Sequence, residues 1–326
     1  MYLVYMNRIY QTAAAALYVV LFFLLFPTYR YVLDIDAISY IHVAERYLNG
    51  HALDALNGYW SPLISWSLMP FIKAGFDPVI AAKYFNGVLG LLSLFTAFKL
   101  FNTFQLPKLF KAVYPFILAV FFISFTFYEL CADLLQLWLL LLYINTILSK
   151  NFIENNYKII LAAILSALCY YAKAYSLPFY LVHFSITLYV LLRIKKTPNL
   201  WKILLKKLSI GFAVFFVLTT PYIYAISSKY GSFRINNAGK LNTSWFLSPG
   251  ISDTRKMIAE PPFVDATSYW DEPTYAQEKL ISPFTSAHFF FVQIKWTISN
   301  IIKFSGMLNT MSVFTYLIVF GFIFYL

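Results

Sequence analysis

The chain has 326 residues, of which 60% are hydrophobic, 21% aromatic and only 12% charged. Soluble domains carry roughly 25% charged residues, and a water-soluble globule of this size could not bury so much apolar surface. The net charge of +11 does not indicate nucleic-acid binding, because the basic residues form neither a single face nor an RNA-binding module. The composition predicts an all-α protein that crosses a membrane several times and is surrounded by membrane lipids.

Apolar runs follow one another along the chain, and runs of about 17–25 residues are long enough for a helix to cross a bilayer. They lie near residues 10–29, 78–101, 112–128, 131–149, 157–173, 177–192, 208–227 and 309–326. The first is expected to remain as an anchor, since no small-residue cleavage site follows it. We therefore expect one transmembrane domain over residues 1–326, which stops inside its last apolar run and so is expected to be a C-terminally truncated piece of a longer protein.

Basic residues predict the orientation. The segment between the sixth and seventh runs carries six of them and no acid: Arg193, Lys195, Lys196, Lys202, Lys206 and Lys207. Because cytoplasmic loops are enriched in Lys and Arg, this segment and the N-terminus should be cytoplasmic, in the plasma (inner) membrane. Of the 14 acidic residues, only Glu154 falls on that side. The remaining acids indicate that the functional site is extracytoplasmic.

Two long segments are expected outside, at residues 31–77 and 228–308. In the first, apolar residues at helical spacing predict an amphipathic surface helix that begins near Asp36 and ends at Asn49-Gly50. Asp36 is either the cap of this helix or a functional carboxylate. A second short helix is expected over residues 63–72.

Three short motifs occur at the outer ends of the predicted spans. Asp36 is followed four residues later by Tyr40, Asp133 stands before a pair of leucines with Glu129 four residues upstream, and Lys173 lies in the turn after the fifth span. In order, spacing and sidedness they resemble the GT-C class of membrane glycosyltransferases. More narrowly, they are similar to the branch that contains protein O-mannosyltransferases and lipid A aminoarabinose transferases. The matches cover about residues 1–230.

Two positions depart from the family pattern. Ala37 stands where the family often has Glu, and Ala174 replaces a Gly after the matched lysine. Asp34, two residues upstream of Asp36, is the candidate for a second catalytic carboxylate.

The resemblance implies a GT-C-like helix bundle that transfers a sugar from a polyprenyl-phosphate carrier to a lipid, glycan or protein acceptor at the outer leaflet. Asp36 would then be the general base for the acceptor hydroxyl. Lys173 would stabilise the departing phosphate, or else extend to lipid headgroups. Asp133 at the membrane boundary is either functional or a partner of Lys173, and Glu129 would share its helix face.

Further substrate-binding candidates lie in both outer segments. Arg46 is a second cation, and Trp60 either holds a sugar or belongs to an interfacial aromatic belt. Trp270 and Asp271 pair an aromatic ring with an acid, as in sugar sites, or form a turn anchored by the tryptophan. No cofactor is certain, and the histidines and the two cysteines show no metal-ligand spacing. A divalent cation remains compatible with oxygen ligands from the acids: Asp34, Asp36, Asp133 and a phosphate.

Two other functions compete with the glycosyltransferase. A transporter or flippase of lipid-linked sugars should carry charges within its spans and show broken helices or repeats, whereas the middles of these spans are nearly free of charge. A non-catalytic membrane subunit is the second alternative. An enzyme should bring Asp36, Asp133 and Lys173 to one cavity, whereas scattered positions would favour the subunit.

Overall fold

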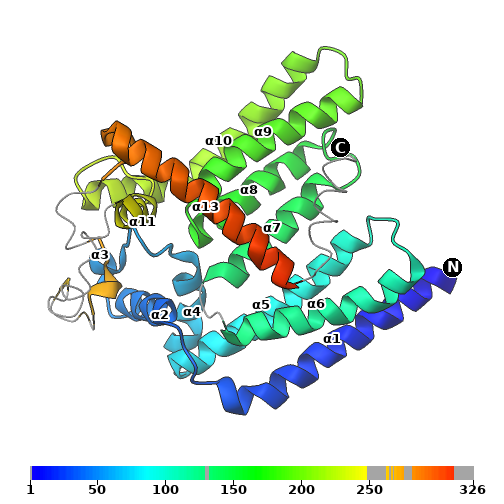
Figure 1. Ribbon diagram of the computed structural model, residues 1–326, viewed down its shortest axis with the longest axis horizontal. Coiled ribbons are helices and arrows are strands. Elements are labelled where there is room, and N and C mark those ends of the chain that lie inside the picture. Colours follow the sequence, from blue (N-terminus) through cyan, green and yellow to red (C-terminus); the bar gives the residue numbers. More distant parts are fainter. Residues whose placement is uncertain are drawn as a thin grey trace. The chain divides into compact units, whose positions relative to one another are not determined.

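Long apolar helices dominate the computed structural model, which describes residues 2–128, 132–247, 262, 263, 266, 268–274 and 281–311. Within these residues the chain forms helices and no strand. Five of the helices are long and apolar enough to cross a membrane. The coarse prediction of an α-helical membrane protein is therefore confirmed (Figure 1).

The chain divides into two units, and each is described by itself. Unit 1 comprises Met1–Asn236 with Trp270–Glu272, and unit 2 comprises Asn237–Tyr269 with Pro273–Leu326. The helices of unit 1 are α1 (Tyr2–Tyr29), α2 (Ile35–Leu48), α3 (Ala52–Ala55), α4 (Leu63–Lys73), α5 (Pro78–Phe101), α6 (Lys108–Tyr128), α7 (Ala132–Ile147), α8 (Asn156–Ala172), α9 (Ser176–Ile194) and α10 (Leu200–Lys229). The single transmembrane domain over residues 1–326 stays a prediction.

Seven of the eight predicted spans coincide with helices. The five that are long and apolar enough to cross a bilayer are α1, α5, α6, α9 and α10. Helices α7 and α8 have only 16 and 17 residues, fewer than the roughly 20 that a bilayer requires. Helix α8 has the same length as the predicted span 157–173, whereas α7 as described ends two residues before the predicted span 131–149 does. The predicted span 309–326 lies outside the described residues, apart from the end of α13 (Ala287–Met311).

Glycines let α1 approach α5 closely. A Cβ atom on Gly87 would come within 2.4 Å of the Phe22 ring, and one on Gly90 within 2.2 Å of the Tyr18 hydroxyl. That hydroxyl donates to Gly87 O at 2.8 Å and lies 2.9 Å from Thr126 Oγ1 on α6. Small residues and interhelical hydrogen bonds of this kind hold membrane helices together, so α1, α5 and α6 pack side by side (Figure 1).

Unit 2 is built from fewer elements among its described residues. Helix α11 (Ala238–Leu247) packs against α13, and the short turn η3 (Pro283–Thr285) begins with a capping box from Ser282. The hydroxyl of Ser244 on α11 accepts from Ile281 N at 2.7 Å. Helix α11, η3 and most of α13 lie within the predicted segment 228–308.

Candidate functional site

Helix α2 carries three of the predicted site residues, Asp36, Tyr40 and Arg46, and its sequence sets its ends. The carboxylate of Asp34 accepts from Ala37 N at 2.6 Å and caps the N-terminus. Asn49 forms the C-cap, and Gly50 follows at φ +84°, a left-handed conformation that glycine adopts without strain. The capping role considered for Asp36 therefore belongs to Asp34, and Asp36 lies within the first turn.

Asp34 has a second structural role, an electrostatic interaction with a buried lysine. It lies close enough to Lys83 for their charges to interact. The Lys83 side chain is 0% exposed and donates to Phe127 O at 3.1 Å, at the end of α6. An oxygen acceptor and a nearby carboxylate make the burial of this ammonium tolerable. Asp34 thus supports the start of α2 and the neighbouring end of α5.

Asp36 has a different environment. It is half-buried, and its Oδ1 accepts from Trp270 Nε1 at 2.9 Å. In the part of the chain that the structure describes, no partner contacts its second oxygen, Oδ2. The carboxylate is therefore held in place by an indole N–H while one oxygen can still accept a proton.

Three aromatic rings cluster beside this indole, and two of them contact it directly. Trp60 packs edge-on against Trp270 with the ring centroids 5.8 Å apart, and Tyr40 meets Trp60 at 5.1 Å. Tyr59 contacts both tryptophans. The carbonyl of Trp270 accepts from Trp60 Nε1 at 2.8 Å and from Ser39 Oγ at 3.2 Å. Aromatic pairs of this geometry add to the stabilisation by burial. Together with the two hydrogen bonds to its carbonyl, they hold Trp270 in place.

Asp271 anchors the segment next to Trp270. Its side chain is 1% exposed; Oδ2 lies 3.1 Å from Arg46 Nη2, and Oδ1 lies 3.1 Å from His42 Nδ1. Its carbonyl accepts from Asn57 Nδ2 at 2.8 Å. Arg46 and Asp271, both predicted to bind substrate, thus contact each other. Their role in substrate binding stays a prediction, and the geometry favours a structural one.

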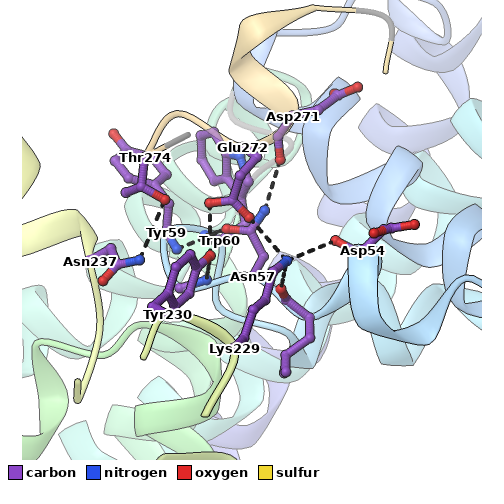
Figure 2. Close-up of polar contacts among 12 residues, drawn as sticks. Asp54, Asn57, Tyr59, Trp60, Lys229, Tyr230, Asn237, Asp271, Glu272 and Thr274 are labelled. Atoms are coloured by element: carbon purple, nitrogen blue, oxygen red, sulfur yellow. Dashed lines mark hydrogen bonds and ion pairs between the residues drawn. The ribbon is translucent and has the colours of Figure 1, made fainter. Parts of the chain in front are cut away.

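Asn57 and Glu272 complete the attachment of this segment (Figure 2). Asn57 Oδ1 accepts from the amides of Tyr59 and Trp60 at 2.8 and 3.0 Å, which shapes the turn before α4. Glu272 Oε1 accepts from Tyr230 Oη at 2.8 Å, and its Oε2 lies 3.5 Å from Lys229 Nζ. The end of α10 is thereby linked to the same cluster.

Lys173 and Asp133 form an ion pair of their own. The Nζ and Oδ1 atoms lie 2.5 Å apart, and the side chains are 29% and 39% exposed. The structure thus makes Asp133 a partner of Lys173, which was one of the two alternatives for Asp133 in the sequence analysis. The convergence of this pair with Asp36 on one cavity stays a prediction, and Glu129 lies outside the described residues.

A cleft of about 590 Å³ lies along the C-terminal half of α2. Its polar lining includes Glu45 and Lys73, and its apolar lining includes Leu48 and Met69. Tyr47 also lines it, and burial raises the pKa of this phenol, an effect that a hydrogen bond with Trp66 partly offsets. The phenol is therefore a neutral hydrogen-bonding group at neutral pH, and the cleft suits an amphiphilic ligand.

The sequence is compatible with a divalent cation held by acidic residues. Among the described residues, no three His, Cys, Asp or Glu side chains come together as metal ligands. Asp34 and Asp133 are engaged by the chain itself.

Sequence reasoning missed three contributors to this cluster. Asn57 carries a recognisable signal, since Asn-Gly marks a turn. His42 and Tyr230 carry none, because their partners lie 229 and 42 residues away in the sequence.

No known protein family, curated protein or solved structure matches the chain. A function therefore has to be argued from its own residues.

Proposed function

We propose that the chain is a membrane glycosyltransferase of GT-C type, which transfers a sugar from a polyprenyl-phosphate carrier to an acceptor hydroxyl at the extracytoplasmic face. One observation carries the proposal. Of the predicted acids that the structure describes, Asp36 is the one whose carboxylate keeps an oxygen without a protein partner while the other oxygen is fixed by Trp270 Nε1. A general base needs such a group, positioned and still able to accept a proton.

The other acids support this choice by contrast. Asp34 caps α2 at 2.6 Å, and Asp271 is buried against two basic side chains. Asp133 is paired with Lys173 at 2.5 Å. A carboxylate that already serves a helix cap or an ion pair is less available to approach an acceptor hydroxyl. Asp36 is thus the best-suited base of the set.

In this mechanism the Asp36 carboxylate removes the proton of the acceptor hydroxyl, whose oxygen attacks the anomeric carbon as the bond to the carrier phosphate breaks. Lys173 is proposed as the cation that stabilises the departing phosphate, because its ammonium is partly exposed and Asp133 holds it at the end of α8. The cleft lined by Glu45, Tyr47 and Met69 is proposed to bind the acceptor.

The proposed orientation follows from the loops. The ends of helices that meet α2 lie at one face of unit 1, since Lys83 joins the end of α6, and Tyr230, after α10, joins the turn before α4. The lysine-rich segment between α9 and α10 belongs to the opposite ends of these helices. The rule that basic loops stay in the cytoplasm therefore makes the α2 face extracytoplasmic.

The test is sugar transfer from a panel of labelled polyprenyl-phosphate sugars by the purified protein. Asp36→Asn keeps the shape of the side chain and removes the base, so transfer should fall by about 10²–10⁴-fold. Asp54→Asn is the matched control, because Asp54 is a half-exposed acid of the same segment, and it should transfer at the unaltered rate. Equal transfer by the unaltered protein and Asp36→Asn would overturn the role of Asp36. No sugar transfer from any donor of the panel would overturn the proposed glycosyltransferase activity itself.

A further inference from the structure

A second cleft lies at the opposite end of unit 1, between α1 and α5. Its volume is about 370 Å³, and its lining includes Arg8 and Gln11 from α1 with Phe95, Phe98, Lys99 and Asn102 from α5 and its C-cap. Ligand sites in proteins have volumes of about 300–1,000 Å³. This cleft, at the lower end of that range, is the size of a small polar headgroup and not of a whole lipid.

The charge of this cleft is all of one sign. Arg8 and Lys99 line it, and no acidic residue does. Within the described residues neither cation forms an ion pair with a carboxylate. Two uncompensated cations in the lining of one cleft create a positive potential that attracts an anion from outside the protein.

An amide network includes two residues of the cleft lining, Gln11 and Asn102. Asn102 Oδ1 accepts from Asn7 Nδ2 at 2.7 Å and from Gln11 Nε2 at 3.0 Å. Gln11 Nε2 also contacts the Tyr114 hydroxyl at 2.7 Å, which joins α6 to the network. Because the Asn102 oxygen takes both of these bonds, its NH₂ group remains to donate to a ligand. The site thus offers neutral donors as well as charge, the combination that phosphate oxygens accept.

The surroundings indicate where the anion comes from. The cleft lies between two helices long enough to cross a membrane, at the start of one and the end of the other. The Phe95 ring is 49% exposed beside it, and Phe98 is buried. An apolar ring at the mouth of a cationic cleft suits an acyl chain attached to the phosphate, and basic pockets between membrane helices bind the headgroups of anionic lipids.

We propose that the cleft between α1 and α5 binds the phosphodiester headgroup of an anionic phospholipid, with Arg8 and Lys99 pairing with the phosphate and Asn102 donating to it. This inference is independent of the proposed transferase activity, since it uses no residue of the α2 face. Free phosphate would satisfy the same donors, and the apolar mouth favours the lipid.

The test is lipid binding measured by native mass spectrometry of the detergent-purified protein. Phosphatidylglycerol is compared with phosphatidylcholine of the same acyl chains, and the protein should prefer phosphatidylglycerol. Arg8→Gln combined with Lys99→Gln should lower the phosphatidylglycerol affinity by about 30-fold, because each basic residue near a lipid surface contributes a several-fold factor. The matched control is Lys108→Gln with Lys111→Gln, which removes the same charge from the adjacent start of α6 and should change the affinity by less than about 3-fold.

A second variant keeps the test decisive if the double variant does not fold. Asn102→Asp retains the oxygen that accepts from Asn7 and Gln11 but places a negative charge in the cleft, so it should lower the phosphatidylglycerol affinity by about fivefold or more. Three results would overturn the proposal: no preference for phosphatidylglycerol, an equal loss in the control pair, or an unchanged affinity in Asn102→Asp. Displacement of phosphatidylglycerol by inorganic phosphate at equal concentration would also overturn it, since the site would then bind the free anion.

Discussion

The two ends of unit 1 use charge in opposite ways. At the end that carries α2, Asp271 is buried against Arg46 and His42, and Glu272 contacts Lys229. At the other end, Arg8 and Lys99 line a cleft without a carboxylate partner in the described chain. Buried charges must be matched within the protein because desolvation is costly. Exposed cations face no such cost, so they remain available to a ligand. The difference distinguishes charged side chains that stabilise the fold from charged side chains that can bind a ligand.

The largest effect on stability is expected from the buried pair. Asp271→Ala removes the carboxylate that Arg46 and His42 share, and breaking a buried ion pair of this kind costs about 3–5 kcal/mol of the free energy of unfolding. Chemical unfolding in detergent measures it. The matched control is Asp54→Ala, which breaks a half-exposed contact with His51 and should cost at most about 1 kcal/mol.

The same experiment tests the comparison between the ends. Arg8→Gln and Lys99→Gln should each change the free energy of unfolding by less than about 0.5 kcal/mol, as surface substitutions usually do. A large loss at either position would show that the cations of the cleft are structural, and the contrast between the two ends would disappear.

The next effect concerns Trp270 and depends on the proposed activity. Trp270→Phe retains a ring between Tyr59 and Trp60 but removes the N–H that fixes Asp36. A hydrogen bond to a charged group contributes about 1.5–3 kcal/mol, so kcat for sugar transfer should fall about 10-fold or more while KM changes little. Trp201→Phe, on a residue that is 67% exposed at the start of α10, is the control and should retain kcat. A normal kcat in Trp270→Phe would show that Trp270 contributes to packing and that its N–H does not position Asp36 for catalysis.

The sequence predicted the elements better than the contacts. Helix α2 lies where its apolar spacing and the Asn49-Gly50 signal place one, because capping and periodicity are local properties. The attachment of Trp270 to Asp36 spans 234 residues, and no local pattern encodes such a pairing. The sequence therefore supplied the residues of the candidate site, whereas only the fold shows that Asp271 is buried and that one oxygen of Asp36 has no partner among the described residues.

The cleft at the opposite end was missed for the same reason. Arg8 and Lys99 are unremarkable basic residues in the sequence, and they come to one cleft only because α1 and α5 pack closely. Gly87 and Gly90 allow this approach, but isolated glycines in an apolar run do not say which helix they face. Pairing between helices is a long-range property that periodicity leaves open.

Gly90 lies on α5, a helix that extends between the two ends of unit 1. A methyl group on Gly90 would come within 2.2 Å of the Tyr18 hydroxyl and 2.5 Å of Thr126 Oγ1, two atoms that hydrogen-bond to each other. Gly90→Ala therefore requires the Tyr18 and Thr126 side chains, or the helices that carry them, to shift, and overpacking of this kind costs about 1–3 kcal/mol of the free energy of unfolding. Gly306→Ala is the matched control, since its added methyl group would meet open space on α13 and should leave stability equal or slightly higher.

Phosphatidylglycerol binding by Gly90→Ala and by Asp271→Ala is a second measurement that distinguishes the two ends of unit 1. Arg8 and Lys99 lie on the two helices that meet at Gly90, so a shift of α1 relative to α5 in Gly90→Ala should weaken phosphatidylglycerol binding together with stability. In Asp271→Ala, the lipid affinity of the folded protein should be unchanged, since the lost ion pair lies at the other end. Weakened binding in Asp271→Ala would show that the two ends are coupled through the helices. Unaltered binding in Gly90→Ala would show that the cleft does not depend on the close contact between α1 and α5.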